Sequence, residues 1–269
     1  MSKRETLPRT AAPGPGLLII NADDWGLDRL TTDRILECVR RGAVSTTSAM
    51  VFMADSERAA VLKGGETVPV GLHLNLTTPF SAPDCPAALR ERQRRIARYL
   101  DHRLAPVWFH PGLARDFDYV VRAQFDEYQR LYGTAPEHLD GHHHSHLCTN
   151  ILLGGLLPRG MRVRRNFSFH PGEKGFANRA YRRLVDYLLA RRYRVVDYFF
   201  SLVPFQPYER VERMFALSRN FAVEIETHPA NSDEYNFLMG EEFRRLTAGL
   251  PLAAAGAKLA PSASEGGAR

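Results

Sequence analysis

Histidine and aspartate side chains gather in short polar segments of this 269-residue chain. These segments are residues 21–26, 71–75, 138–146 and 226–229. The adjacent carboxylates of Asp23 and Asp24 cannot both be buried and ionised cheaply unless a positive charge neutralises them. A divalent metal supplies that charge, and imidazoles from His73 and His142 would complete a site of two nitrogens and one carboxylate oxygen. The pattern therefore indicates a metal site with positions left open for water.

Each segment also has a simpler interpretation when it is taken alone. Asp23 and Asp24 are compatible with a turn in which one aspartate caps a helix. His73 is compatible with a hydrogen-bonded core histidine. Residues 138–146, which hold five of the ten histidines, are compatible with a solvated loop that binds metals adventitiously. The metal site is favoured because the segments occur together, at the ends of predicted strands.

The elements that would position these residues alternate between strand and helix. Apolar runs predict strands over residues 17–21, 46–52, 68–76, 138–141, 161–164, 195–202 and 221–227. Helical periodicity and stop signals predict helices over residues 31–41, 56–62, 87–100, 117–132, 151–157, 178–192, 209–218 and 241–248. The first of these helices would be capped by Thr31 or Thr32. This alternation predicts a parallel sheet, open or closed into a barrel, with functional groups at the carboxyl ends of its strands.

Length and composition are those of an ordinary globular protein. The chain fits one α/β barrel over residues 17–252, with a disordered arm over residues 1–16 and a disordered tail over residues 253–269. Residues 77–115 interrupt the alternation with five prolines, so we expect a lid-like insertion there. We find no apolar run long enough for a membrane span or a signal peptide. Three widely spaced cysteines are typical of reduced thiols in a cytoplasmic protein.

The net charge of +6 comes almost entirely from arginine. Arginines cluster over residues 90–98, 159–165 and 179–194, and we interpret these clusters as solvated helix faces. No nucleic-acid-binding module is recognisable. The alternative is a non-enzymatic, arginine-rich protein that binds nucleic acid, anionic lipid or another anionic ligand.

The four polar segments resemble the signatures of the YdjC-like carbohydrate deacetylases, also called the ChbG/HpnK family. The matching segments are Asn-Ala-Asp-Asp-Trp-Gly at 21–26, Gly-Leu-His-Leu-Asn-Leu-Thr at 71–77, the histidine segment at 138–146 and Thr-His-Pro at 227–229. A Tyr235-Asn236 pair also resembles a late family motif. The order of these motifs and the spacing between them agree with the family pattern over residues 17–250, so the resemblance is specific.

The resemblance implies a single irregular (β/α) barrel, similar to a TIM barrel, that removes acetyl from an N-acetylated sugar of the N-acetylglucosamine type. It implies that Asp24, His73 and His142 are the metal ligands. By the same resemblance, Asp23 is the general base and His228 the general acid.

The remaining roles concern the surroundings of the metal. His144 and His146 would support the site without binding the ion, as imidazoles near metals often do. Trp25 stands where phenylalanine is usual and keeps an aromatic wall for the sugar, whereas Ala230 replaces a frequent glycine. Zn²⁺ suits the ligands best, and Mg²⁺, Co²⁺, Ni²⁺, Mn²⁺ and Fe²⁺ are alternatives. The resemblance also suggests a homodimer.

Two other enzyme classes share parts of this pattern. An amidohydrolase-type barrel would use His142 and His144 as a ligand pair, but that class usually carries its His-x-His on the first strand. A non-haem iron oxygenase would share the facial arrangement of two histidines and one carboxylate. Those oxygenases are mostly double-sheet β folds, whereas this chain alternates strand and helix.

Overall fold

The computed structural model describes residues 14–65, 68–169 and 175–253, and within these ranges seven strands form one parallel sheet. The strand order is β5-β4-β3-β2-β1-β7-β6. The strands are β1 (Leu17–Trp25), β2 (Thr46–Ala49), β3 (Val70–Leu74), β4 (His138–Gly141), β5 (Arg162–Val163), β6 (Tyr198–Ser201) and β7 (Ala222–Thr227). Each predicted strand is therefore confirmed, mostly with different ends, and β1 continues to Trp25 rather than ending at residue 21.

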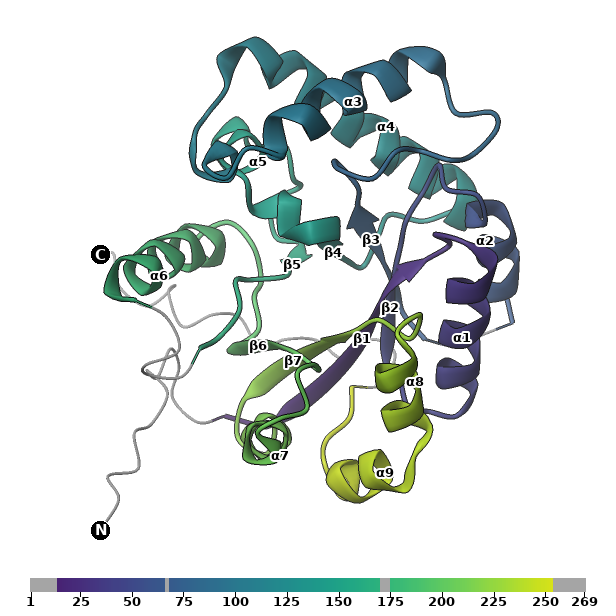
Figure 1. Cartoon of the computed structure of the whole chain (residues 1–269), viewed down its shortest axis with the longest axis vertical. Helices are drawn as coiled ribbons and strands as arrows, with labels where there is room; N and C mark the ends of the chain where they lie inside the picture. The colour runs from purple at the N-terminus through teal and green to yellow at the C-terminus, as the bar shows by residue number, and fades with distance from the viewer. Residues whose placement is uncertain (1–13, 66–67, 170–174, 254–269) are drawn as a thin grey trace.

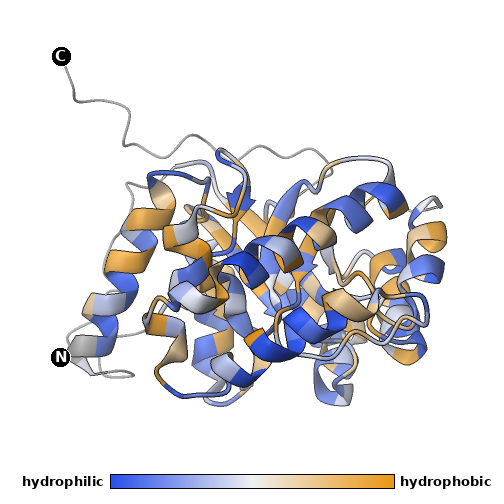
Figure 2. Ribbon diagram, turned by 90° about the horizontal axis from the view of Figure 1, so that it is seen from above, coloured by the Kyte–Doolittle hydropathy of each residue, from blue (hydrophilic) through white to orange (hydrophobic). Residues whose placement is uncertain are grey.

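Helices surround the outside of the sheet, which curls as Figure 1 shows. They are α1 (Arg29–Arg40), α2 (Ser56–Lys63), α3 (Ala87–Leu100), α4 (Ala114–Tyr132), α5 (Thr149–Gly154), α6 (Phe176–Ala190), α7 (Tyr208–Leu217), α8 (Ser232–Met239) and α9 (Glu241–Thr247), with short 3₁₀ turns η1 (Ala105–Val107), η2 (Pro111–Leu113) and η3 (His142–Leu147). Hydrophilic and hydrophobic residues alternate along these helices in Figure 2, because one face of each packs on the sheet or on a neighbouring helix.

The sheet forms a half-barrel, whereas the sequence predicted a single barrel. β5 and β6 are its two edges and do not pair with each other along their length. A few backbone hydrogen bonds join each edge strand to the segment beside the other, such as Val163 N to Arg194 O at 2.9 Å and Ser168 N to Phe199 O at 2.8 Å. The predicted parallel α/β architecture is thus confirmed in its coarser, barrel-like form.

Alternate residues of β1 face opposite sides of the sheet, as the period of two requires. Leu18 and Ile20 belong to the main hydrophobic core beneath the helices. Ile19 instead packs with Val196 and Phe199 on the concave side. By the same alternation, Asn21 and Asp23 also face the concave side, where they meet polar side chains from neighbouring strands. The inner face of the half-barrel therefore becomes polar towards the carboxyl ends of its strands.

Two local details differ from the sequence predictions, and a third prediction is not confirmed. The first helix begins at Arg29 and is capped by Asp28, whose carboxylate accepts from Thr31 N at 2.8 Å, so neither Thr31 nor Thr32 is the cap. Helix α8 was not predicted at all. The lid-like insertion at residues 77–115 is not confirmed, because α3 lies within it and packs against α4, and Arg92 binds Asp116 at 2.7 Å.

Other expectations meet the limits of the described ranges. The predicted arm and tail fall almost entirely on residues 1–13 and 254–269, which lie outside them. Among the helices that the structure describes, none combines the length and apolarity needed to span a membrane. Cys38, Cys85 and Cys148 are all buried and unpaired.

Candidate metal centre and active site

Three strand ends bring the predicted metal ligands together. Asp24 lies near the end of β1, His73 lies in β3 and His142 follows β4 directly. Asp24 Oδ1 is 3.0 Å from His142 Nδ1 and 3.2 Å from His73 Nε2, and the two ring nitrogens are 3.4 Å apart. Residues separated by up to 118 positions therefore form one compact cluster of donor atoms.

The spacing of these donors fits a shared metal ion. Donor atoms about 2.1 Å from one ion lie roughly 3.0 Å apart at right angles and roughly 3.4 Å apart at the tetrahedral angle. The three observed separations span that interval. Two imidazoles and a carboxylate are also the donor set found in catalytic zinc sites, although the set does not identify the metal.

The remaining nitrogen of His73 is held by a buried carboxylate. Nδ1 of His73 lies 2.8 Å from Asp140 Oδ1, and both side chains are buried. This contact favours the tautomer with a proton on Nδ1, which leaves the Nε2 lone pair directed at the cluster. Burial lowers the pKa of His73, but Asp140 and Asp23 outweigh it and hold that pKa well above its usual range. The surroundings thus stabilise a positive charge here, whether a proton or a metal ion carries it.

Asp24 is adapted to the cluster in backbone and charge. Its φ of 70° lies in the left-handed region, which non-glycine residues rarely adopt and which often marks functional positions. Burial raises the pKa of the Asp24 carboxyl, yet hydrogen bonds from His142 and His73 more than offset this and hold it below its usual range. Asp24 is therefore an anionic donor at the centre of the site.

The predicted acid and base face each other beside this cluster. Asp23 is 2% exposed, and its Oδ2 lies 3.9 Å from His228 Nε2 and 3.8 Å from His73 Nδ1. His228 follows β7, and its side chain remains 37% exposed. Glu234 of α8 accepts from Thr227 Oγ1 at 2.8 Å and from His228 N at 3.0 Å, which anchors the backbone that carries His228.

Arg164 is a central residue that the sequence analysis missed. The arginine cluster at residues 159–165 was interpreted as a solvated face, but Arg164 is 2% exposed and Arg165 is 8% exposed. Arg164 contacts four carboxylates on the concave face, which belong to Asp23, Asp140, Glu224 and Glu226. The sequence did contain one signal for this. Charged or ionisable residues recur at every second position in β4, in β5 and just beyond it, and in β7, which indicates a shared charged face.

Glycines make room for the buried histidines around the site. A Cβ added to Gly71 would overlap the ring of His138, and one added to Gly141 would lie 2.8 Å from His146 Nδ1. His138 Nε2 lies 3.1 Å from the carbonyl oxygen of the Asn21 side chain. Glycine is therefore required at these two positions because imidazole rings pack directly against the backbone.

The structure places His144 and His146 beside the donor cluster. In the described ranges, two groups of side chains are close enough to share an ion, Asp24–His73–His142 and Asp23–His73–Asp140, and neither group includes His144 or His146. His144 Nε2 lies 3.7 Å from Glu226, and burial lowers the pKa of His144 to about 2. His146 Nε2 lies 3.0 Å from Arg164 O, and burial lowers its pKa to about 4. Trp25 is 2% exposed, so its ring offers no open face to a sugar.

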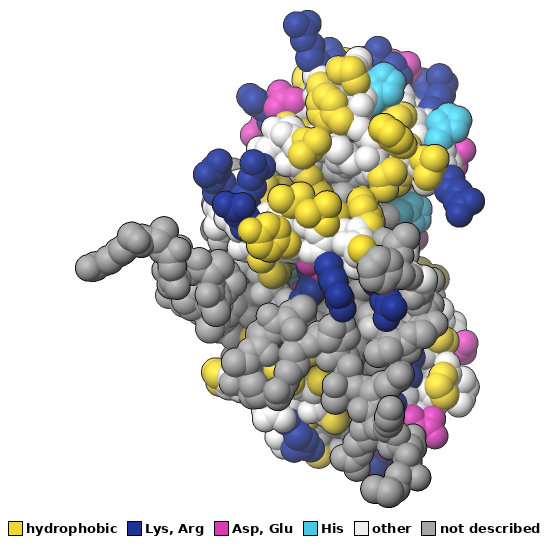
Figure 3. Space-filling view, turned by 90° about the vertical axis from the view of Figure 1, so that its left-hand side faces the viewer, with side chains coloured by type: hydrophobic (Ala, Val, Ile, Leu, Met, Phe, Trp, Pro, Cys, Tyr) yellow, Lys and Arg dark blue, Asp and Glu magenta, His cyan; other side chains and the backbone are white. Residues whose placement is uncertain are grey.

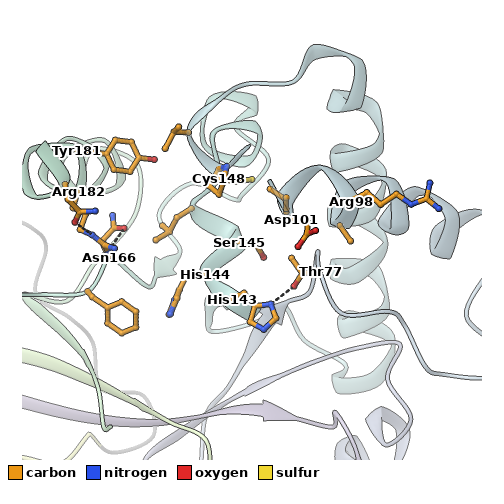
Figure 4. A pocket seen from close by; sticks show the side chains of 17 residues that line it. Thr77, Arg98, Asp101, His143, His144, Ser145, Cys148, Asn166, Tyr181 and Arg182 are labelled. Carbon is orange, nitrogen blue, oxygen red and sulfur yellow. Dashed lines mark hydrogen bonds between the residues drawn. The ribbon is translucent and has the colours of Figure 1, made fainter. Parts of the chain in front are cut away.

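A pocket of about 740 Å³ opens beside the histidine segment (Figure 4). Asn166, Tyr181 and Arg182 line one side of it, and Thr77 lines the other with Ala97, Arg98, Leu100, Asp101, Pro106 and Val107. The segment predicted as a lid thus contributes a wall of this pocket. His143 and His144 also line it, and a contact of 3.0 Å joins His143 Nδ1 to Thr77 Oγ1.

The remaining arginines include many on exposed helix surfaces. Figure 3 shows Lys and Arg side chains spread among hydrophobic ones over one face of the molecule. Arg94 and Arg122 are mostly exposed and form ion pairs with glutamate or aspartate on their own helices. Such pairs contribute little to stability or binding. Arg94 thus fits the interpretation as a solvated face, whereas Arg92 of α3 binds buried Asp116 and Arg182 of α6 lines the pocket.

Comparison with known proteins supports the resemblance of the four segments. The chain is 31% identical over 141 residues to a chitooligosaccharide deacetylase of Yersinia pestis (strain Pestoides F), which covers 50% of this chain and 52% of the relative. It is 34% identical over 140 residues to a chitooligosaccharide deacetylase of Proteus mirabilis (strain HI4320), with the same coverage. The chain thus spans about half the length of the curated relatives it matches.

The fold also has a counterpart among solved structures. A protein of Enterococcus faecalis V583, provisionally described as a cellobiose-phosphate cleavage protein, superposes with a TM-score of 0.63 at 19% identity, over 90% of this chain and 98% of that one. At this identity the similarity concerns the fold alone. A family model described as YdjC-like protein matches residues 17–248, and the chain therefore belongs to the YdjC-like family.

Proposed function

We propose that this protein is a metal-dependent carbohydrate deacetylase that hydrolyses the acetamide of an N-acetylated sugar to acetate and a free amino sugar. The observation that carries the proposal is the Asp24–His73–His142 cluster, with donor atoms 3.0–3.4 Å apart at the mouth of the half-barrel. The activity named for the curated relatives agrees with it.

Asp24, His73 and His142 would hold the ion. When bound, a divalent metal lowers the pKa of water and polarises the amide carbonyl. Zn²⁺ fits the two imidazole donors best, because Mg²⁺ prefers oxygen ligands. Asp140 would keep the Nδ1 proton on His73, so that Nε2 stays available as a donor.

Asp23 would act as the general base through Oδ2. Its Oδ1 already accepts from Asn21 Nδ2 at 2.7 Å and from Arg164 Nη2 at 2.8 Å. Oδ2 accepts from Arg164 Nη1 at 2.5 Å and otherwise faces the rings of His73 and His228. Oδ2 would take one proton from a water molecule while the oxygen of that water bonds to the amide carbon. A positioned base of this kind contributes about 10²–10⁴-fold.

His228 would act as the general acid. It would donate the proton on Nε2 to the amide nitrogen as the carbon–nitrogen bond breaks, so that the amine leaves neutral. The 3.9 Å between His228 Nε2 and Asp23 Oδ2 then provides a short route for the proton gained by Asp23 to return to His228. The partial exposure of His228 suits a group that must reach the substrate.

The sugar would extend from the cluster into the neighbouring pocket. Phe167 borders both this pocket and a second one of about 380 Å³, and its ring centroid lies 4.6 Å from that of His144. Its half-buried ring is better placed than the buried Trp25 to pack against a sugar face. Asn166 and Arg182 supply polar groups on the same wall.

Acetate release from N-acetylglucosamine oligomers tests the proposal. We expect activity in the metal-loaded protein, loss with chelator and recovery on adding Zn²⁺ or Co²⁺. Asp24→Asn should lose both metal and activity, whereas Asp23→Asn should keep metal and lose turnover. Asp33→Asn, which alters an exposed carboxylate on α1, is the matched control and should change neither. Acetate release that is unaffected by chelator and by Asp24→Asn would refute the proposal.

A further inference from the structure

A single arginine links the proposed base to the ligand shell of the metal. Arg164 donates to both oxygens of Asp23, from Nη1 to Oδ2 at 2.5 Å and from Nη2 to Oδ1 at 2.8 Å. The same Nη2 lies 2.8 Å from Asp140 Oδ2, while the other oxygen of Asp140 holds His73. The side chain therefore touches the base directly and a metal ligand through one intermediate.

Two glutamates of β7 also hold the guanidinium group of Arg164. Arg164 Nε lies 2.7 Å from Glu224 Oε1, and Nη1 lies 3.1 Å from Glu226 Oε2. The ring centroid of Phe199 lies 4.9 Å from the guanidinium carbon, against one face of the group. Backbone contacts hold the residue as well, since its N–H donates to Leu139 O at 2.9 Å. Its planar fork is thus oriented before any substrate arrives.

Charge balance alone does not explain this arrangement. A lysine would also place a positive charge among the carboxylates, but its ammonium cannot grip both oxygens of Asp23 and reach Asp140 and Glu224 at once. The bidentate grip fixes the plane of the Asp23 carboxylate, which decides the direction in which Oδ2 meets a water molecule. Catalytic groups lose much of their effect when displaced by about 1 Å.

We propose that Arg164 is a positioning residue that orients the Asp23 carboxylate for proton transfer and ties it, through Asp140, to the imidazole of His73. This proposal rests on the proposed function, in which Asp23 is the base. The ion pairs of Arg164 go to Asp23, Asp140, Glu224 and Glu226 rather than to the three proposed metal ligands, so its effect on catalysis would pass through Asp23.

A double-mutant cycle on the full-length, zinc-loaded protein tests this, with an N-acetylglucosamine disaccharide as probe. We expect Arg164→Lys to lower kcat by about 100-fold with KM within about threefold. In the Asp23→Asn background the same substitution should lower kcat no further, because there is no base left to orient. Losses that multiply in the double variant would overturn the proposal, and so would an Arg164→Lys variant with wild-type kcat.

Arg165→Lys is the matched control, because Arg165 is the adjacent buried arginine. Its Nη2 binds Asp186 at 2.6 Å, and its Nη1 donates to the Val196 carbonyl at 3.2 Å, away from the metal cluster. We expect lower thermal stability in this variant with an unchanged kcat for the folded protein. A loss of kcat equal to that of Arg164→Lys would show that any buried arginine here matters equally, which contradicts a positioning role.

A second substitution covers the case in which Arg164→Lys does not fold. Glu224→Gln changes only the group that holds Nε of Arg164, and it should lower kcat by roughly three- to tenfold with Asp23 present and not at all in Asp23→Asn. An equal loss in both backgrounds, or none in either, would overturn the inference. If Asp23→Asn alone retains full activity, the base assignment in the proposed function fails first, and this inference fails with it.

Discussion

The contact between Asp140 and His73 allows a quantitative prediction about metal affinity. Asp140→Asn keeps the shape of the side chain but removes its charge, and it places an amide that has two donors between His73 Nδ1 and Arg164. Both of these partners are donors 2.8 Å from the native carboxylate. The asparagine has one acceptor oxygen, so it can satisfy one partner and must present its NH₂ to the other.

The expected costs to metal binding and to folding have separate physical causes. Removal of a carboxylate behind a metal-bound histidine typically weakens metal affinity or activity about 10–100-fold, or about 1.4–2.7 kcal/mol in affinity. Breaking a buried ion pair often costs about 3–5 kcal/mol because a charge is left unpaired. Here Arg164 keeps contacts with Asp23, Glu224 and Glu226, so we expect a loss of folding stability below about 3 kcal/mol.

Zinc affinity would be measured by competition with a chromophoric chelator, and stability by urea denaturation of the metal-free protein. Asp116→Asn is the control, because Asp116 is also buried and contacts Arg92 and Arg95 at 2.7 Å each, between α3 and α4. It should lower stability and leave zinc affinity unchanged. Zinc affinity of Asp140→Asn within threefold of the native value would refute the assignment of His73 as a ligand oriented by this carboxylate.

Three further predictions concern separate parts of the site. His228→Ala should lower kcat about 10²–10⁴-fold while metal content, measured by atomic absorption, stays at the native level; native turnover would exclude the acid role. Gly71→Ala should cost about 1–3 kcal/mol in urea denaturation because its methyl overlaps the ring of His138. Gly175→Ala should cost much less, because no atom of the described residues lies within 4 Å of the added methyl. Burial and neighbouring carboxylates raise the pKa of Glu226 well above its usual range. Since a raised folded-state pKa gives stability that is lost as pH rises, Glu226→Gln should gain stability relative to the native metal-free protein between pH 5 and pH 8, and a difference independent of pH would contradict this.

The regular elements were largely predictable because their patterns are local. The apolar residues of β1 and β3 and the helical periodicity of α4 depend on neighbours a few positions away. Helix α8 was missed because its acidic first turn follows a proline-containing loop and only part of one face is buried. The hydrogen bond from Thr227 to Glu234 that holds this helix forms only in the folded structure, so the local sequence pattern does not show it. The cap at Asp28 was missed for a similar reason, since two threonines nearby suit the same role.

The donor cluster was proposed residue by residue from the sequence, but the buried charges around it were not. The resemblance to the family named Asp24, His73 and His142 as ligands, and the structure brings their donor atoms within 3.4 Å of one another. Nothing in that resemblance pointed to Arg164 or to the carboxylates of Glu224 and Glu226. The predicted homodimer and cytoplasmic location stay predictions.

The sequence by itself determined the order of strands and helices, the family and the chemical types available at the strand ends. Alternation within each strand also determined which side chains share a face, because the period of two is set by the local backbone. Only the tertiary structure decided that the concave face closes around Arg164, since this depends on the curl of the sheet. That curl brings β5 opposite β1 and β7, and it converts an arginine in an apparently solvated run into a fully buried partner of four carboxylates.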